Sequence, residues 1–203
     1  MLSIIGLASI AIKPFSDSAN RSTGCAMAEV LSLVNDIIYL SRLEEEGYEP
    51  EREPVDLYDL AADTIDSLRE TAKKRAVRFQ LKGEHVTVMG VWRILSEMLY
   101  NLCDNAVKYN RRGGSVEVFV SERNGAAVLS VEDTGIGISP EHQGRVYERF
   151  FRVDKSHSKA IGGTGLGLSI VKHGAQFHHA EIALESEPGL GTKFTLTFPK
   201  HGE

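Results

Sequence analysis

Residues 92–109 read WRILSEMLYNLCDNAVKY and carry the clearest structural signal in the chain. Projected as an α-helix at about 100° per residue, the segment places its apolar side chains on one broad side. That side comprises Trp92, Leu95, Met98, Leu99, Leu102, Cys103, Ala106 and Tyr109. The opposite side comprises Glu97, Asn101, Asp104, Asn105 and Lys108. The pattern predicts a long amphipathic helix that packs against a core and keeps one polar face.

Two asparagines stand one turn apart on that polar face. A solvated helix surface explains charged residues there, but it does not explain Asn101 and Asn105, because Asn is a poor helix former. Amide oxygens at i and i+4, with the ammonium group of Lys108 nearby, can hold a divalent cation and a polyphosphate together. The face is therefore open to two interpretations, a solvated surface or a cation and phosphate site.

The segments on both sides of this helix follow strand and helix patterns. Helices are predicted from Leu57 to Ala72 and from Thr164 to Phe177. Strands are predicted at Val77–Leu81, Val86–Met89, Ser115–Ser121, Ala127–Glu132, Glu181–Glu185 and Thr192–Phe198. Asn124-Gly125 is a preferred tight-turn pair and joins two of these strands as a hairpin. Because hairpins join the strand pairs and helices come between them, we expect an α+β fold. It is a two-layer α/β sandwich, with a mixed, mainly antiparallel sheet and helices on one face.

The first 46 residues have a different, helical character. Two helices are predicted, one in the near-apolar run Met1–Ile12 and one after the loop-like segment Lys13–Gly24. The second carries Val30, Leu33, Ile37 and Leu40 at helical spacing, and its wide apolar stripe favours a bundle. Residues 47–54 contain one glycine and two prolines, so no helix runs through them. We expect a partial helical hairpin at 1–46, a linker at 47–54 and a second domain at 55–203.

Composition limits the function classes. The 203 residues include 28 acidic and 23 basic side chains, and this net charge of −5 gives no reason to expect a nucleic-acid partner. Met1–Ile12 is well short of the ~20 residues that a spanning helix needs, so any membrane contact is expected through segments outside this sequence. Cys25 and Cys103 are too few for a disulfide framework. We expect both to be reduced and buried in a cytoplasmic protein.

Asp133-Thr-Gly-Ile-Gly137 follows directly after a predicted strand. Its glycines let a flat ligand approach the backbone while the carboxylate accepts a hydrogen bond, for example from an amino-purine. An ordinary glycine turn is the plain alternative. Asp-Thr-Gly is also typical of aspartic proteases, which need two such carboxylates to share a proton. With one copy, that interpretation requires a symmetric dimer of a nearly all-β chain, which the helical content disfavours.

A second glycine-rich segment, Gly162-Gly-Thr-Gly-Leu-Gly-Leu-Ser169, opens the last predicted helix. Glycines at a helix N-terminus expose backbone N–H groups to phosphate oxygens. Leu168 and Ile170 exclude a P-loop, which requires Lys at 168, and a dinucleotide fingerprint, which requires Gly at 168 or 170. Tyr147–Asp154 (YERFFRVD) and the Ser, Lys and Gly residues after it predict either a hinged lid or a plain exposed loop.

Taken in chain order, these four motifs resemble the asparagine, first glycine, phenylalanine and second glycine boxes of sensor histidine kinases. Gly189-Leu-Gly-Thr-Lys-Phe194 resembles the family's trailing glycine box. The resemblance covers Val55 to Pro199, the family's ATP-binding domain, and residues 31–47 resemble the second helix of its dimerisation bundle. It implies the sandwich fold shared with gyrase, the ninety-kilodalton heat-shock chaperones and mismatch-repair ATPases.

The resemblance implies ATP and Mg²⁺ as ligands and assigns roles at the phosphate end. Asn105, supported by Asn101, would bind Mg²⁺, and Lys108 would meet the phosphates. Arg152 would neutralise charge on the transferred γ-phosphoryl group, so Asn101 and Arg152 are the implied catalytic residues. Hydrolytic relatives carry Glu at the position of Asn101, and an amide cannot act as a general base for water. We therefore expect phosphoryl transfer with slow hydrolysis.

The resemblance also assigns the adenine end and the loops. Asp133 would accept a hydrogen bond from the adenine amino group, and Tyr109 would lie along the ring. The remaining implied ATP contacts are Gly135, Gly137, Phe150, Gly163, Thr164, Gly165, Leu166, Gly167, Leu168 and Thr192.

The family's phosphoryl acceptor is a His on the first bundle helix. Met1-Leu-Ser-Ile-Ile-Gly6 resembles the continuation of that helix, so we expect the acceptor before residue 1 and no autophosphorylation by this chain alone. The implied partners are a response regulator receiver domain and a second copy of the chain, which forms a homodimer through the bundle. The implied location is the cytoplasmic portion of a membrane-anchored sensor. Two alternatives remain, a nucleotide-binding regulatory module without transfer activity and a protein serine kinase with this fold.

Overall fold

The computed structural model describes residues 30–31, 33–45, 47, 50–153 and 163–199. The predicted helix at 1–12, the predicted loop at 13–24, Cys25 and residues 154–162 of the predicted lid lie outside this description. The division into domains at 46 and 55 stays a prediction.

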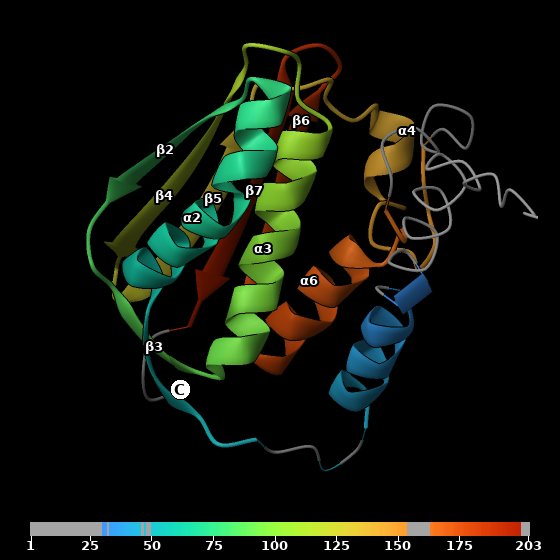
Figure 1. The fold of residues 1–203 in the computed structure, drawn as a ribbon. Coiled ribbons are helices and arrows are strands. Elements are labelled where there is room, and N and C mark those ends of the chain that lie inside the picture. Colours follow the sequence, from blue (N-terminus) through green and yellow to red (C-terminus); the bar gives the residue numbers. More distant parts are fainter. Residues whose placement is uncertain (1–29, 32, 46, 48–49, 154–162, 200–203) are drawn as a thin grey trace, which may run out of the picture.

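The largest element is a five-stranded sheet in the order β2-β4-β5-β7-β6 (Figure 1). Its strands are β2 (Arg78–Gly83), β4 (Ser115–Arg123), β5 (Ala126–Asp133), β6 (Glu181–Glu187) and β7 (Gly191–Phe198). β2 runs parallel to β4, and the other three pairs are antiparallel. The predicted mixed, mainly antiparallel sheet is confirmed. A small second sheet pairs β1 (Glu53–Asp56) with β3 (Thr87–Gly90) in antiparallel register.

Three helices cover one face of the large sheet (Figure 1). They are α2 (Leu57–Arg75), α3 (Trp92–Lys108) and α6 (Gly167–Phe177). The short helix α4 (Pro140–Gln143) lies at the end where β5 leaves the sheet. A further helix, described at residues 30–31 and 33–43 and called the helix at 30–43, lies beside α6. Helices on a single face confirm the predicted two-layer α+β sandwich. Among the described residues, no helix combines the length and apolar character needed to cross a bilayer.

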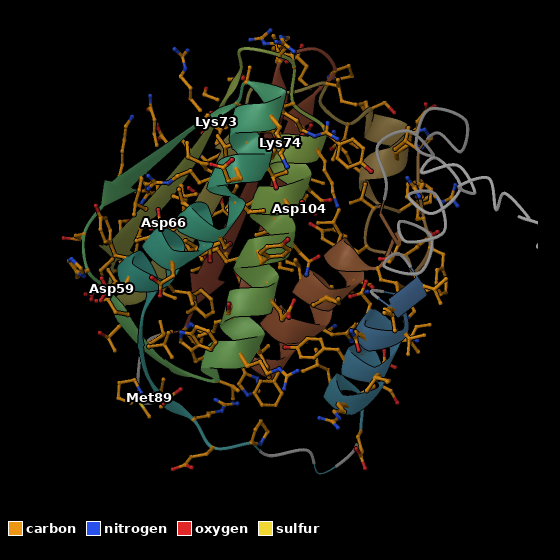
Figure 2. The ribbon with its side chains drawn as sticks, in the orientation of Figure 1. Asp59, Asp66, Lys73, Lys74, Met89 and Asp104 are labelled. Carbon is orange, nitrogen blue, oxygen red and sulfur yellow. The ribbon has the colours of Figure 1, made fainter. Side chains whose placement is uncertain are left out.

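Local sequence explains where α2 begins and how it is charged. The Asp56 carboxylate accepts hydrogen bonds from two backbone N–H groups of the first turn, at 2.8 and 3.0 Å. Figure 2 shows acidic Asp59 and Asp66 on the earlier part of α2 and Lys73 and Lys74 near its end. Asp59 in the first turn and Lys73 and Lys74 in the last turn each lie near the helix-dipole end of opposite sign, whereas Asp66 lies in the middle of the helix.

The core lies between the helices and the inner face of the sheet. Val116, Val118 and Val120 alternate along β4 and are fully buried there. α3 buries the predicted Leu95, Met98, Leu99, Leu102, Cys103 and Ala106. The predicted burial of Trp92 is wrong, since its side chain is 48% exposed. Side chains in a helix lean toward its N-terminus, so the first residue projects beyond the end of the helix.

Most predicted elements are confirmed with small shifts at their ends, and the predicted tight turn between β4 and β5 is confirmed. Asn124 and Gly125 both have positive φ, 54° and 83°, as the tight hairpin requires. The last helix begins at Gly167 and not at Thr164. Its predicted start is wrong because Gly165 has a φ of 75°, which an α-helix cannot include. β1 and α4 were not among the predicted elements.

The helix at 30–43 has two apolar sides. Leu40 is 2% exposed and packs with Leu166 and Ile170, and Leu33 packs partly against them. The other apolar side faces solvent, and its residues are Val30, Leu31, Val34, Ile37 and Ile38. The predicted stripe is therefore divided between contact with the α/β sandwich and an exposed surface.

Candidate functional site

The four sequence motifs meet around the C-terminal half of α3. The N–H of Ile136 donates to the carbonyl of Tyr109 at 3.1 Å, which joins the loop after β5 to the end of the helix. The N–H of Phe150 donates to the carbonyl of Gly165 at 2.9 Å. Arg152 Nη1 donates to the carbonyl of Gly163 at 2.6 Å. The phenylalanine segment thus lies directly against the glycine loop before α6.

The glycine loop also reaches the polar face of α3. A Cβ added at Gly167 would lie 2.6 Å from Asn101 Oδ1, so only glycine lets the first turn of α6 approach the amide so closely. Asn101 Nδ2 donates to the carbonyl of Glu97 at 2.8 Å, which leaves Oδ1 toward Gly167. Asn105 is half-buried one turn along the same face. The two asparagines and the loop therefore share one region.

Lys108 is held in place by its own helix. Its Nζ lies 2.6 Å from Asp104 Oδ2, and both side chains are largely buried, at 26% and 15% exposed. Asp104 lies on the C-terminal half of α3 in Figure 2. An acid one turn before a lysine is the favourable order for such a pair. The ammonium group therefore stands at the C-terminal end of the polar face, next to Asn105.

Asp133 is the last residue of β5 and is tied into the loop that follows. Its Oδ1 accepts a 2.6 Å hydrogen bond from the N–H of Gly135. Burial raises the pKa of Asp133 to about 6, although the N–H groups of Gly135 and Thr192 oppose the rise; Glu132 adds to it. Thr192, paired with Asp133 across β5 and β7, is buried and hydrogen-bonded to Ser186 at 2.9 Å.

The nucleotide-free chain is expected to titrate at Asp133 near pH 6, well above the ordinary value of 3.8. An adenine amino group that donates to this carboxylate would favour the charged form, so ADP should lower the pKa. Carbon-detected NMR of the Asp133 carboxyl group across pH 4–8, with and without ADP, measures both effects. An ordinary pKa in the free chain, or one that ADP leaves unchanged, contradicts the expectation.

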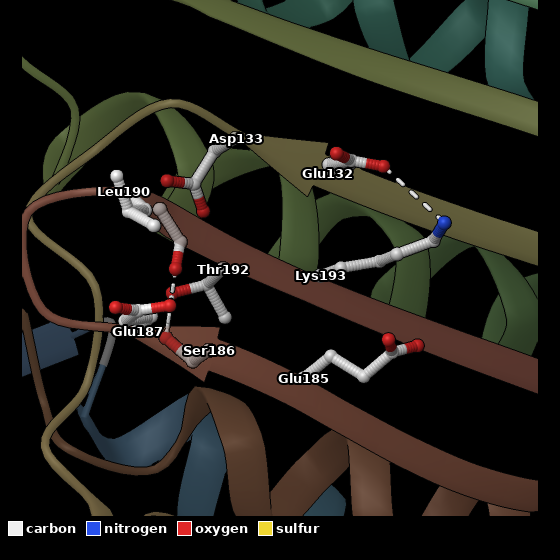
Figure 3. A pocket seen from close by; sticks show the side chains of 9 residues that line it. Glu132, Asp133, Glu185, Ser186, Glu187, Leu190, Thr192 and Lys193 are labelled. Carbon is white, nitrogen blue, oxygen red and sulfur yellow. Dashed lines mark hydrogen bonds and ion pairs between the residues drawn. The ribbon is translucent and has the colours of Figure 1, made fainter.

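A hollow of about 390 Å³ lies at the ends of β5, β6 and β7 (Figure 3). It is lined by Glu132, Asp133, Glu185, Ser186, Glu187, Leu190, Gly191, Thr192 and Lys193. Lys193 pairs with Glu132 at 3.3 Å, which leaves the hollow rich in carboxylates. Carboxylates repel phosphate. A polyphosphate therefore fits the α3 and α6 side of Asp133 and not this hollow.

The loop before α6 is shaped for an anion. Leu166 is fully buried and anchors it, while Leu168 packs partly against the main core. In the described part of the chain no side chain caps the first turn of α6, so its backbone N–H groups face the loop region. The hydroxyl of Thr164 accepts from the N–H of Leu166 at 3.2 Å. Backbone donors at a helix start, with glycines beside them, suit phosphate oxygens.

Phe150 adopts an unfavourable conformation at the base of the predicted lid. Its φ is 61°, a left-handed value that costs a bulky residue of the order of 1–3 kcal/mol. Its ring is 57% exposed, while its backbone is fixed on Gly165. The rest of the lid, residues 154–162, lies outside the description.

One residue at this site was not predicted from the sequence. Asp36, on the helix at 30–43, accepts a 2.8 Å hydrogen bond from the hydroxyl of Thr164. Helical periodicity places Asp36 between apolar positions, which identifies its helix but gives no signal for a partner 128 residues away.

Comparison with known proteins gives one family. The model of the histidine kinase-, DNA gyrase B- and HSP90-like ATPase family matches residues 90–202. The sensor-like histidine kinase SenX3 of Mycolicibacterium smegmatis is 34% identical over 204 residues, and the phosphate regulon sensor protein PhoR of Pseudomonas aeruginosa is 38% identical over 168 residues. These matches cover 98% and 82% of this chain, but only 53% and 38% of the relatives. The chain thus spans about half the length of the curated relatives or less.

Solved structures of similar fold support the same family. Full-length ShkA in complex with AMPPNP has a TM-score of 0.78 and 26% identity, over 92% of this chain and 40% of that one. The mycobacterial sensor histidine kinase MprB has a TM-score of 0.65 and 29% identity, over 73% of this chain and 97% of that one. With the family model covering more than half of the chain and the four motifs gathered around α3, the chain belongs to the histidine kinase-, DNA gyrase B- and HSP90-like ATPase family.

Proposed function

We propose that this chain is the ATP-binding kinase portion of a two-component sensor histidine kinase. It would bind ATP with Mg²⁺ and transfer the γ-phosphoryl group to a histidine on the dimerisation bundle, for relay to the receiver domain of a response regulator. The observation that carries the proposal is the meeting of Asn101, Asn105, Lys108 and the glycine loop on one side of Asp133. The similarity to SenX3 and PhoR supports the sensor context.

The adenine end of the site rests on Asp133. The N–H groups of Gly135 and Thr192 hold the carboxylate in place, and its remaining lone pairs would accept from the adenine amino group. Tyr109 ends α3 beside Gly135, where its ring would lie along the base. Thr192 is the residue across the strand pair, and Gly137 keeps the loop close to β6. These neighbours are the residues that would surround a flat amino-purine bound at Asp133.

The phosphate end fits Mg²⁺ and a polyphosphate by its donors. Asn105 and Asn101 offer amide oxygens on a face that also carries Lys108, and hard cations prefer oxygen ligands. Gly163, Gly165 and Gly167 would bring backbone N–H groups to the phosphates, with Thr164, Leu166 and Leu168 between them. Arg152, fixed at the loop by its bond to Gly163, would offset charge on the γ-phosphoryl group, and Phe150 would close the site at the lid base. Such positioning and charge stabilisation supply most of the catalysis in phosphoryl transfer.

We also propose the larger assembly. The domain division is a bundle segment at 1–46, a linker at 47–54 and the ATP-binding domain at 55–203, in the cytoplasmic part of a membrane-anchored sensor. The exposed stripe from Val30 to Ile38 supports a homodimer through the bundle, because such a stripe normally packs against another helix. Sedimentation equilibrium of the chain, with Ile37→Asp as the disrupting variant, tests this association.

The test of the reaction uses labelled ATP, Mg²⁺ and an added bundle that carries an acceptor histidine. We expect acid-labile label on the bundle and much slower ATP hydrolysis without it. Asn101→Glu should keep ATP affinity within roughly threefold, because a carboxylate still ligates Mg²⁺, and should raise hydrolysis, because it can activate water.

Other outcomes would assign another function. Acid-stable label favours a protein serine kinase, and ATP binding without any transfer favours a regulatory module. Wild-type hydrolysis as fast as that of a dedicated ATPase contradicts the transferase assignment.

A further inference from the structure

The helix at 30–43 contacts the α/β sandwich at three points in or beside the glycine loop. Near its middle, Asp36 Oδ2 accepts the 2.8 Å hydrogen bond from Thr164 Oγ1. One turn later, Leu40 is buried against Leu166 and Ile170. At its end, the Glu44 carboxylate forms ion pairs with Arg149, just before the loop's partner Phe150, and with His173 of α6.

The contact occupies the hydroxyl group of Thr164, a residue that the proposed function places between the glycines that would bind the phosphates. A hydroxyl has one proton. While Thr164 donates that proton to Asp36, it cannot donate it to a phosphate oxygen. Its lone pairs accept from the N–H of Leu166, which also withdraws that backbone donor from the loop.

The docked helix also brings negative charge to the place where phosphates would bind. Asp36 is half-buried beside the loop, and burial raises its pKa, with the hydrogen bond from Thr164 and the charge of Lys108 opposing the rise. Glu97 lies near enough for the charge of Asp36 to add to its own burial in raising its pKa, while Arg93 opposes that rise. A charged Asp36 beside the glycine loop repels a polyphosphate, and the repulsion is stronger in a half-buried place than in water.

We propose that the helix at 30–43 is an internal competitor of ATP, in which Asp36 holds Thr164 of the glycine loop and must release it before the phosphates can bind. The inference rests on the proposed function. Helix docking and ATP binding then oppose each other, and the coupling is reciprocal, so ATP drives the helix off and a docked helix weakens ATP binding. A partner that binds the exposed stripe and moves this helix would therefore change the contact between Asp36 and Thr164, and with it ATP binding.

The test compares Asp36→Ala with the wild-type chain by calorimetric titration of ATP in the presence of Mg²⁺. We expect Asp36→Ala to bind ATP about tenfold more tightly, within the usual range of coupling between two sites. Glu44→Gln loosens the far end of the helix without touching the loop and should tighten binding by roughly threefold, in the same direction. Glu45→Gln is the matched control, because Glu45 is exposed and neighbours Glu44, and it should change nothing.

Hydrogen exchange gives a second measurement that needs no nucleotide. Amides of residues 33–43 should exchange faster in Asp36→Ala than in the wild-type chain, and ATP should speed their exchange in the wild-type chain. Equal or weaker ATP binding by Asp36→Ala, or unchanged exchange in the helix, overturns the inference. If neither the wild-type chain nor Asp36→Ala binds ATP, the proposed function fails as well, which separates the two failures.

Discussion

Asp133→Asn is expected to weaken ATP binding by about a hundredfold or more. The amide NH₂ group of the variant would face the adenine amino group, and both groups are hydrogen-bond donors. Asp133 Oδ1 is committed to the N–H of Gly135. In the asparagine variant the amide oxygen keeps that bond, and the NH₂ group turns toward the adenine amine. The adenine amine loses its charged acceptor and is buried without a partner. Calorimetric titration of ATP measures the loss.

The variant should lose binding without losing its fold. The folded-state pKa of Asp133 is raised to about 6, so its stabilising contribution is full below the unfolded value of 3.8 and is lost as the pH rises through about 6. Above that pH the buried wild-type carboxylate is charged, which lowers the free energy of unfolding. The neutral amide of the variant avoids this loss. The thermal midpoint of Asp133→Asn at pH 7.5 should therefore equal or exceed that of the wild-type chain. Asp63→Asn, on the exposed side of α2, is the control, and wild-type affinity in Asp133→Asn would exclude the assigned role.

The sequence was sufficient to predict a structural feature where the residues of one segment determine that feature by themselves. The polar and apolar faces of α3 follow from periodicity alone, and Asn124-Gly125 specifies its hairpin because both residues accept positive φ. The four motifs also predicted the candidate site, and the structure brings their segments together around α3, while the roles of the single residues stay predictions. The parallel pairing of β2 with β4 could be expected only as part of a mixed sheet, because strand patterns do not state direction.

The features that could not be predicted depend on which other segment of the chain packs against each surface. Periodicity shows that the helix at 30–43 is apolar, but not that Leu40 would be buried against Ile170 while Ile37 stays exposed. The predicted burial of Trp92 is wrong for a related reason, because a helical projection treats every position as if the helix continued beyond it. The bond between Asp36 and Thr164 joins segments from opposite parts of the chain, and no local pattern encodes it.

Gly137→Ala is expected to lower the free energy of unfolding by about 3 kcal/mol or more, because it combines backbone strain with a steric clash. The φ of Gly137 is 68°, and a Cβ there would lie 2.0 Å from the carbonyl oxygen of Glu187. That oxygen belongs to the backbone, so it cannot turn away as a side chain could. Urea denaturation measures the loss.

Gly113→Ala separates the two causes. Gly113 also has a left-handed φ, 83°, but nothing lies within 4 Å of an added Cβ, so its variant should lose only about 1 kcal/mol. Equal losses at both positions would show that strain alone acts at Gly137. The clash also bears on the site, because Glu187 pairs with Gly191, where an added Cβ would lie 1.9 Å from the carbonyl oxygen of Asp133. A displaced Glu187 therefore disturbs the backbone of Asp133, the proposed adenine acceptor. Gly137→Ala should weaken ATP binding, while Gly113→Ala should leave it unchanged.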